Sequence, residues 1–388
     1  MTAQRWTLVD EQWGAPREER RLGKTELGGA LAGCEVVYHR LRGGLRDGVE
    51  VVHVQCGDVA FAVLPSRGMG IWKAWAGGES IGWQSPVRGP VHPGFVPLSE
   101  PSGLGWLDGF DEWLVRCGLE SNGAPEFDSD GRLKYPLHGR IANRPAHRVE
   151  VTADPDAGEI SVTGVVDETR FLFKKLQLTS TVTVRVGEAA LQIRDQVQNL
   201  SARPAEMQLL YHINFGPPLL EPGARFLAPV RRVVPRDARA AEGIGTWNRY
   251  GEGEADYTEQ VYFLELIADA GGNTLAMLRN AAQDRGVSMR FNQQQLPCFA
   301  LWKNTTSQTD GYVTGLEPGT NFPNPRTFEQ GRGRVVPLAA GATATFDLSL
   351  EIHRDAAAVH RIEETISEMR GPQKPEIHEQ PQPEWCVV

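Results

Sequence analysis

The stretch Leu176-Gln-Leu-Thr-Ser-Thr-Val-Thr-Val-Arg-Val186 alternates apolar and polar residues along most of its length. Such a period of two places one set of side chains on a buried face and the other set in water, which is typical of a half-buried β-strand. The apolar set consists of Leu176, Leu178, Val182, Val184 and Val186. The stretch therefore predicts a strand that packs one face on a core.

Similar patterns recur on both sides of this stretch. We expect further strands at residues 51–56, 59–64, 159–167, 191–197, 207–215, 274–278, 287–291, 299–303 and 346–352. Glycines and prolines are spread between these strands instead of being gathered in one linker, and no fixed-period repeat is present. The sequence therefore predicts an all-β fold in one continuous domain.

A clear amphipathic helical stripe is found only near the end, over residues 355–370, where Asp355 is placed to cap a helix. We expect an N-terminal arm over 1–50, a β-sandwich over 51–353, a helix over 354–370 and an extended tail over 371–388. Residues 85–102 and 221–247 fit no regular element. Long irregular segments of this kind either roof a binding cleft or are surface connections.

Composition narrows the classes of function. The chain has 388 residues, of which 40% are hydrophobic, so it can bury a sizeable core. A formal net charge of −9 argues against nucleic acid as a partner. The first residues lack the apolar run of a signal peptide, and no apolar stretch is long enough for a membrane span. We expect a cytoplasmic protein whose five scattered cysteines are core thiols.

Familiar catalytic motifs are missing from the sequence. Gly23-Lys24-Thr25 resembles the end of a phosphate-binding loop, but Glu18 stands where that motif has glycine, and no strand precedes it. The chain contains no G-x-S-x-G elbow, no H-E-x-x-H and no G-x-G-x-x-G between a strand and a helix. Serine hydrolase, zinc protease and dinucleotide-binding functions therefore lack local support.

Polar side chains are concentrated instead in a few short stretches that also contain glycine. One of these stretches carries His212, and another carries Glu317. In the strand expected at 207–215, His212 shares a face with Asn214, opposite the apolar positions. Glu317 lies in a late Glu-Pro-Gly turn. A histidine can protonate an oxygen near neutral pH, and a carboxylate can take a proton from a hydroxyl. Such a pair could open and close a pyranose ring without a cofactor, although a strand histidine and a Glu-Pro turn are also common structural features.

The order and context of these motifs resemble the aldose 1-epimerase (galactose mutarotase-like) family, in particular an uncharacterised branch of it. The matching segments are Leu137-His138-Gly139, Tyr211-His212 and Glu317-Pro318. The resemblance implies a galactose mutarotase-like antiparallel β-supersandwich with a concave sugar cleft. It also implies His212 as the general acid, Glu317 as the general base and His138 as an orienting hydrogen-bond partner, with no cofactor and no metal.

The resemblance also suggests residues that bind the substrate. Arg67 resembles an early arginine of the family that contacts the sugar. The other expected substrate-binding residues are Arg140, Asn143, Trp302 and Lys303. The sequence departs from galactose mutarotases beside the proposed site, because His212 is followed by Ile-Asn-Phe without the usual proline and His138-Gly139 by Arg140 instead of a second glycine. The departures weaken an assignment to galactose or glucose more than they weaken the fold.

Two other functions remain open at this stage. His138, His212 and Glu317 could be ligands in a metal-dependent sugar isomerase or lyase, or the chain could be a non-catalytic carbohydrate-binding protein. The expected partner in each case is a small-molecule sugar. The sequence leaves open which sugar this is, and whether the protein is a monomer or a homodimer.

Overall fold

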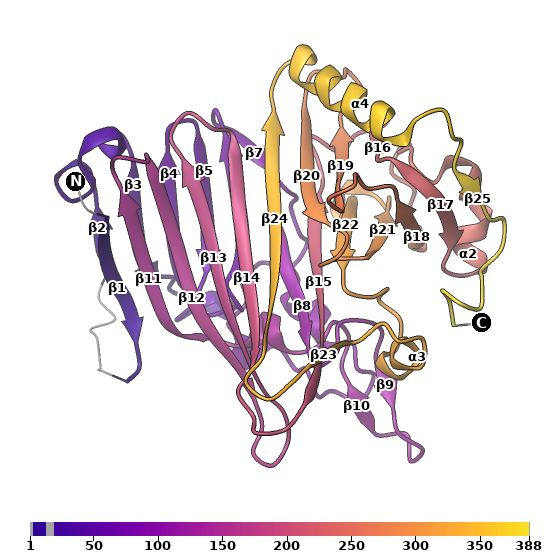
Figure 1. Cartoon of the computed structure of the whole chain (residues 1–388), viewed down its shortest axis with the longest axis horizontal. Helices are drawn as coiled ribbons and strands as arrows, with labels where there is room; N and C mark the ends of the chain where they lie inside the picture. The colour runs from indigo at the N-terminus through magenta and orange to yellow at the C-terminus, as the bar shows by residue number, and fades with distance from the viewer. Residues whose placement is uncertain (1–2, 13–18, 388) are drawn as a thin grey trace.

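Two large antiparallel sheets form most of the molecule (Figure 1). The structure, a computed structural model, describes residues 3–12 and 19–387. Within these ranges the first sheet contains, in spatial order, β1 (Gln4–Asp10), β11 (Ala146–Asp154), β12 (Glu159–Thr169), β13 (Lys175–Arg185), β14 (Ala190–Asn199), β24 (Thr343–His353), β20 (Gly286–Asn292), β19 (Asn273–Arg279) and β16 (Arg225–Leu227).

The second sheet carries the proposed site. Its main path is β2 (Arg20–Leu22), β3 (Glu35–Arg40), β4 (Glu50–Cys56), β5 (Val59–Leu64), β6 (Gly70–Ala76), β8 (Leu114–Leu119), β15 (Ala205–Phe215), β22 (Val313–Gly319), β21 (Cys298–Asn304), β18 (Gln260–Leu266), β17 (Val230–Pro235) and β25 (Glu376–Ile377). Two short strands flank it, β7 (Glu79–Ile81) beside β6 and β23 (Val336–Leu338) beside β15. A separate hairpin joins β9 (Glu126–Phe127) and β10 (Leu133–Tyr135).

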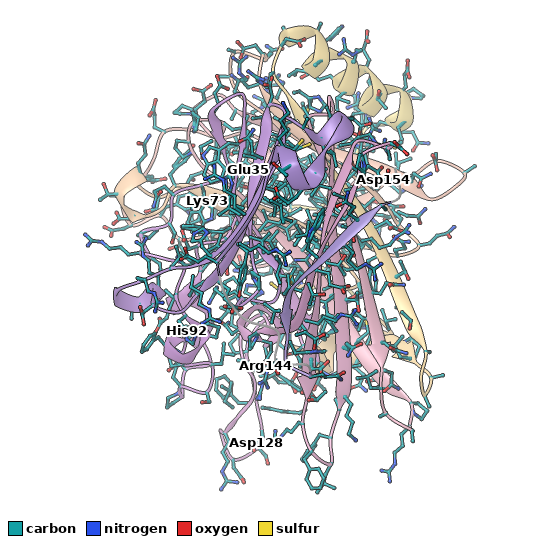
Figure 2. The ribbon with its side chains drawn as sticks, turned by 90° about the vertical axis from the view of Figure 1, so that its left-hand side faces the viewer. Glu35, Lys73, His92, Asp128, Arg144 and Asp154 are labelled. Atoms are coloured by element: carbon teal, nitrogen blue, oxygen red, sulfur yellow. The ribbon has the colours of Figure 1, made fainter. Side chains whose placement is uncertain are left out.

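The two sheets pack face to face and enclose the main core. Figure 2 shows the layers from the side, with Glu35 on β3 in one layer and Asp154 at the end of β11 in the other. Along β13 and β15, alternate apolar side chains of both sheets belong to the same buried cluster, which is what a period of two produces. A fully buried ion pair between Arg116 on β8 and Asp195 on β14 links the two layers.

Helices are few and short in the described part of the chain: α1 (Lys24–Leu27), α2 (Ala238–Glu242), α3 (Arg326–Gly331) and α4 (Ala356–Arg370). The Asp355 side chain caps α4 by accepting a hydrogen bond from the Ala358 N–H. Val359, Ile362 and Ile366 of α4 pack on the outer face of the first sheet. None of the helices among these residues is long and apolar enough to cross a membrane.

The all-β supersandwich and the C-terminal helix expected from the sequence are confirmed. The five cysteines are buried and free, as expected. The segment 1–50, expected as an arm, contributes β1 to the first sheet and β2 and β3 to the second. The segment 371–388, expected as an extended tail, contributes β25, which pairs with β17; positions 1–2, 13–18 and 388 of these segments lie outside the described residues.

Candidate active site

His212 and Glu317 meet because their strands are neighbours in register. β15 and β22 are antiparallel, and the register that pairs Ile213 with Leu316 places His212 opposite Glu317. Opposed side chains on one face of such a pair lie close together. Here Nε2 of His212 is 3.2 Å from Oε1 of Glu317, and both side chains are buried. The sheet itself therefore builds a histidine–carboxyl pair.

Gly315 makes room for this pair. It lies on β22, opposite Asn214 on β15 and opposite Trp302 on β21. A Cβ atom at Gly315 would come within 2.7 Å of Oε1 of Glu317 and within 2.9 Å of Cε1 of His212. The missing side chain therefore lets three larger side chains converge above one position of the sheet.

His138 stands beside His212 with an unusual backbone conformation. Its φ of 57° is in the left-handed region, which is uncommon for a residue other than glycine and costs conformational energy. Its Nδ1–H donates a hydrogen bond to the carbonyl oxygen of Asn122 over 3.0 Å. The rings of His138 and His212 are 5.3 Å apart and nearly perpendicular. His138 therefore presents its remaining nitrogen, Nε2, as an acceptor beside the His212–Glu317 pair.

A cavity of about 380 Å³ opens over the three residues. Its walls are aromatic: Trp106 packs on His138 at a ring distance of 4.6 Å, and Phe110 and Trp302 pack on His212 at 5.2 Å and 5.3 Å. Leucine, valine, alanine and proline side chains complete most of the remaining surface. Flat aromatic faces beside a few polar groups suit a ligand with both apolar faces and hydroxyl groups.

A charged group closes one side of this cavity. Arg236, which follows β17, pairs with Oε1 of Glu259 over 3.0 Å and with Asp237 over 2.8 Å. The other carboxylate oxygen of Glu259 accepts a hydrogen bond of 2.6 Å from Nε1 of Trp302. Trp302 is therefore held at its nitrogen while its ring faces His212. Arg236 is shared between Glu259 and Asp237, so the formal charges of these three residues sum to −1 beside the cavity.

Burial changes the protonation of the site. Desolvation raises the pKa of Glu317 to about 8 and lowers the pKa of His138 to about 4. It also holds the pKa of His212 well below its usual value, and the neighbouring His138 adds to this effect. Each change favours the uncharged form at neutral pH. The His212–Glu317 pair is therefore favoured as a neutral imidazole beside a neutral carboxyl group.

Arg67, expected to contact the substrate, lies outside this cavity. Its guanidinium is buried and donates hydrogen bonds to Glu112, to the amide oxygen of Asn143 and to the carbonyl oxygens of Val91 and Gly109. All of its nitrogens thus have protein partners. These contacts differ from the expected sugar contact. Arg67 holds the segment from Gly109 to Glu112, and this segment carries Phe110, which packs against His212.

Arg140, Asn143 and Lys303 also lie away from the pair. Arg140 and Asn143 line a small separate cavity of about 200 Å³. Lys303 follows Trp302 on β21 and therefore points to the other face of the sheet, where its Nζ donates to the carbonyl oxygens of Thr246 and Arg249. Of the expected substrate-binding residues, Trp302 is the one that lines the cavity with His138, His212 and Glu317.

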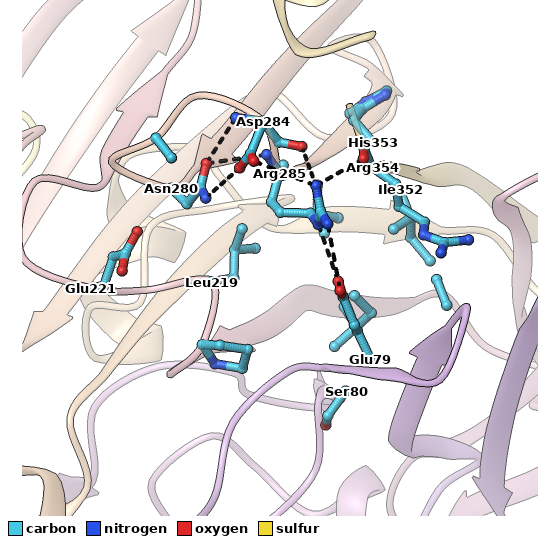
Figure 3. Close-up of a pocket in the computed structure, with 16 residues that line it drawn as sticks. Glu79, Ser80, Leu219, Glu221, Asn280, Asp284, Arg285, Ile352, His353 and Arg354 are labelled. Carbon is cyan, nitrogen blue, oxygen red and sulfur yellow. Dashed lines mark hydrogen bonds and ion pairs between the residues drawn. The ribbon is translucent and has the colours of Figure 1, made fainter. Parts of the chain in front are cut away.

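Another cavity, of about 490 Å³, lies at β7 and the ends of β20 and β24 and holds none of the expected site residues. Figure 3 shows Glu79 and Arg285 reaching across it to form an ion pair, 3.1 Å between Oε2 and Nε. Arg285 also donates to the carbonyl oxygen of Arg354. Arg285 also pairs with Asp284, which lines the same cavity. Within residues 3–12 and 19–387, no group of three or more His, Cys, Asp and Glu side chains is arranged to hold a metal ion.

Among the lining residues that were not expected at the site are two aromatic and two charged ones: Trp106, Phe110, Arg236 and Glu259. Phe110 lies in the stretch Gly109-Phe-Asp-Glu-Trp113, whose composition is a usable signal. Arg236 lies in the irregular segment 221–247, which was expected either to roof a cleft or to connect strands at the surface. Glu259 precedes β18 and carries no local signal, because only the pairing of β18 with β21 brings it to Trp302.

The fold and the pair define a galactose mutarotase-like supersandwich with a buried histidine–carboxyl site, and known proteins share this fold. The chain is similar to a solved structure described as a "putative aldose 1-epimerase" from Klebsiella pneumoniae, with 36% identity over 98% of this chain and 99% of that one and a TM-score of 0.94. A galactose mutarotase-like protein from Clostridium acetobutylicum is 16% identical over 79% of this chain and 96% of its own, with a TM-score of 0.55.

A galactose 1-epimerase from Lactobacillus acidophilus is 12% identical over 82% of this chain and 99% of its own, with a TM-score of 0.53. The last two structures show the fold alone. Residues 46–352 match the model of a domain of unknown function, DUF4432. No curated protein matches the chain. The chain belongs to the DUF4432 family, within the aldose 1-epimerase (galactose mutarotase-like) superfamily.

Proposed function

We propose that this protein interconverts the anomers of an aldose by acid–base opening and closing of the pyranose ring at His212 and Glu317. The observation that carries the proposal is the direct opposition of the two side chains in an aromatic-walled cavity. The description of the Klebsiella pneumoniae protein as an aldose 1-epimerase supports the same reaction.

The reaction requires two proton transfers. One member of the pair gives a proton to the ring oxygen while the other takes the proton of the anomeric hydroxyl, and the bond between the anomeric carbon and the ring oxygen breaks. The open-chain aldehyde then rotates about its carbon–carbon bond. Reversal of both transfers closes the ring on the other face of the carbonyl. The family resemblance assigns the acid to His212 and the base to Glu317.

The other residues of the cavity have supporting roles in this proposal. Nε2 of His138 can accept a hydrogen bond from a sugar hydroxyl and so orient the ring. Trp302 can stack on an apolar face of the sugar, since its indole is fixed by Glu259. No member of this set requires a cofactor or a metal for the proton transfers.

The test is a sugar panel in which anomer interconversion is followed by polarimetry or exchange NMR, with a metal chelator present. We expect at least one aldose to equilibrate faster than in buffer, and the His212→Asn variant to be slow with the same sugar. Interconversion at the buffer rate for every sugar would contradict the proposal. Binding without interconversion would favour a carbohydrate-binding protein, and activity lost with chelator and restored by metal would favour a metal-dependent isomerase.

A further inference from the structure

Asn214 lies two residues after His212 on the same face of β15 and is fully buried. Its amide nitrogen donates to the carbonyl oxygen of Glu112 over 3.0 Å and to that of His212 over 3.2 Å. Its amide oxygen is 2.5 Å from Nδ1 of His212. Both ends of the amide are therefore engaged, one with the backbone and one with the imidazole.

These contacts fix the orientation of the amide. If nitrogen and oxygen were exchanged, the oxygen would face two carbonyl oxygens, and no proton would lie between them. The amide oxygen must therefore face His212, and only a proton on Nδ1 of His212 can complete that short contact. Because Nδ1 carries a proton, a neutral His212 has its lone pair on Nε2, the atom that faces Glu317.

The surroundings favour the neutral ring over the imidazolium. Phe110, Trp106 and Trp302 pack on or beside His212, and Val115 lies opposite it on β8. The titratable groups that face this region are Glu317, His138 and the buried thiol of Cys117, whose pKa is raised by burial. Glu259 and Arg236 line the same cavity and pair with each other, and Arg236 also pairs with Asp237.

Apart from His212, no described group is placed to donate a hydrogen bond to a Glu317 carboxylate. Among the residues that the structure describes, its one polar contact is Nε2 of His212. A buried carboxylate without N–H partners is costly, whereas a carboxylic acid can donate its proton to the lone pair on Nε2. The raised pKa of Glu317 and the lowered pKa of His212 agree with this arrangement.

We infer that Asn214 is a positioning residue: it keeps a proton on Nδ1 of His212, so that in the resting protein Nε2 is unprotonated and the Glu317 carboxyl carries a proton. Glu317 is then the proton donor to the substrate, and Nε2 of His212 is the acceptor. This inference rests on the proposed function, and it reverses the roles that the family resemblance assigns. It also assigns a role to Asn214, which lies in the Ile-Asn-Phe sequence after His212. Galactose mutarotases usually have a proline after the corresponding histidine.

The proton balance of the ring opening then follows. The Glu317 carboxyl gives its proton to the ring oxygen, the bond from that oxygen to the anomeric carbon breaks, and Nε2 of His212 takes the anomeric hydroxyl proton. The pair becomes a carboxylate and an imidazolium, which Asn214 stabilises by accepting the Nδ1–H bond. Ring closure on either face of the aldehyde returns both protons and restores the neutral pair.

The test needs no substrate. We would label histidine with ¹⁵N and record the ring nitrogen shifts of His212 at pH 7, and in parallel record the infrared C=O band of protonated carboxyl groups. We expect Nδ1 of His212 to be protonated and Nε2 to be bare. We also expect a carboxylic acid band that disappears in Glu317→Gln. Glu168→Gln is the matched control, because the Glu168 carboxyl is buried elsewhere and accepts two backbone N–H bonds.

Two substitutions at Asn214 separate positioning from a structural role. Asn214→Asp keeps the acceptor at Nδ1, and its second oxygen faces the carbonyl oxygens of Glu112 and His212, so this side chain should itself be protonated, add a second acid band and leave the His212 tautomer unchanged. Asn214→Leu keeps the size but removes the acceptor, so the tautomers of His212 should mix. For the sugar found in the panel, Asn214→Leu should lower kcat and shift its pH dependence, whereas turnover of the wild-type protein should fall as Glu317 deprotonates.

An imidazolium at His212 in the wild-type protein at pH 7, or the absence of an acid band that depends on Glu317, would overturn the inference. Unchanged spectra in a folded Asn214→Leu variant would overturn it as well. If the expected spectra are found but no aldose is interconverted, the proton arrangement stands and the mutarotase proposal fails. The two failures are therefore distinguishable.

Discussion

Arg67 and Glu112 form an ion pair in which Nε and Oε1 are 2.5 Å apart and the side chains are 1% and 0% exposed. The segment between Gly109 and Glu112 is held at both ends by Arg67, which also donates to the Gly109 carbonyl oxygen. Phe110 is carried by this segment and packs against His212. Arg67 thus supports one wall of the cavity from behind.

Replacing Arg67 with methionine should destabilise the protein by about 3–5 kcal/mol, because a buried Glu112 carboxylate would lose its partner. Urea unfolding followed by fluorescence measures this change. The double variant Arg67→Met with Glu112→Leu should recover part of the loss. As a control, Arg21→Ala, which removes an exposed ion pair with Glu35, should cost about 1 kcal/mol or less. Weaker sugar binding without any loss of stability would instead restore Arg67 as a substrate-binding residue.

Glu317→Gln and His212→Asn should each lower turnover by about 10²-fold or more while sugar binding stays nearly intact, because neither new side chain can exchange the required proton. The measurement is the rate of anomer interconversion beside a binding titration with the same sugar. Since the two residues act as a unit, the double variant should be scarcely slower than either single one. Near-normal turnover in either variant, or losses that multiply in the double variant, would rule out a shared proton-transfer pair.

Gly315→Ala should reduce turnover, because its new methyl group would collide with Oε1 of Glu317 and Cε1 of His212. A misplacement of reacting groups by about 1 Å can cost about 10²-fold in rate, so a shift of the pair away from the new methyl group should be measurable. Gly245→Ala is the matched control, since a Cβ there meets no atom within 4 Å. Turnover and the melting temperature of both variants should be compared. Full activity in Gly315→Ala would show that the pair tolerates displacement.

The stability of the protein should depend on pH through Glu317. Its pKa is raised from 4.5 to about 8, so between these values the folded chain binds one proton more than the unfolded chain. The stability from this neutral carboxyl is therefore fully present below about pH 4.5 and is lost as the pH rises through 8, by at most about 1.4 kcal/mol per pH unit. Urea unfolding at several pH values should show this decline in the wild-type protein but not in Glu317→Gln.

His212 contributes in the opposite sense, because its pKa is lowered. Its contribution to stability is present above its unfolded pKa of about 6.5 and is lost as the pH falls. Since both proteins contain His212, the difference between their stability curves isolates Glu317. Parallel curves for the wild-type protein and Glu317→Gln would show that Glu317 is ionised in the folded state.

The fold was predictable because its strands are long and alternate cleanly. Residues 176–185 lie in β13 and 207–215 in β15, and their alternate apolar positions face the core between the sheets, whereas Val186, expected at the end of the first of these strands, follows β13 and is exposed. Strand order was not predictable from this pattern, because β24 inserts beside β14 and β8 beside β15 through pairings between distant parts of the chain. The strands of segment 1–50 are weakly patterned, which is why this segment was expected as an arm.

The site was predictable in part. A motif gives the identity of a side chain and the face of its strand, so His212 and Glu317 could be proposed without knowing that they touch. The direction of Arg67 depends on Glu112, Asn143 and Gly109, which come from separate segments, so the sequence could not distinguish a sugar contact from an internal one. Lys303 was misplaced for a simpler reason: it adjoins Trp302 on a strand, and neighbours on a strand face opposite ways.

The pairing of β15 with β22 has a consequence for how this protein can diverge. A shift of the β15–β22 register by one residue would place Leu316 or Pro318 opposite His212. A relative can therefore keep the His212–Glu317 pair only if it also keeps this register. The cavity rim is different, because much of it comes from segments outside these two strands, near Leu104, Ala124, Arg236 and Pro323. If the proposed function holds, insertions and substitutions there can change the preferred sugar while the His212–Glu317 pair stays the same.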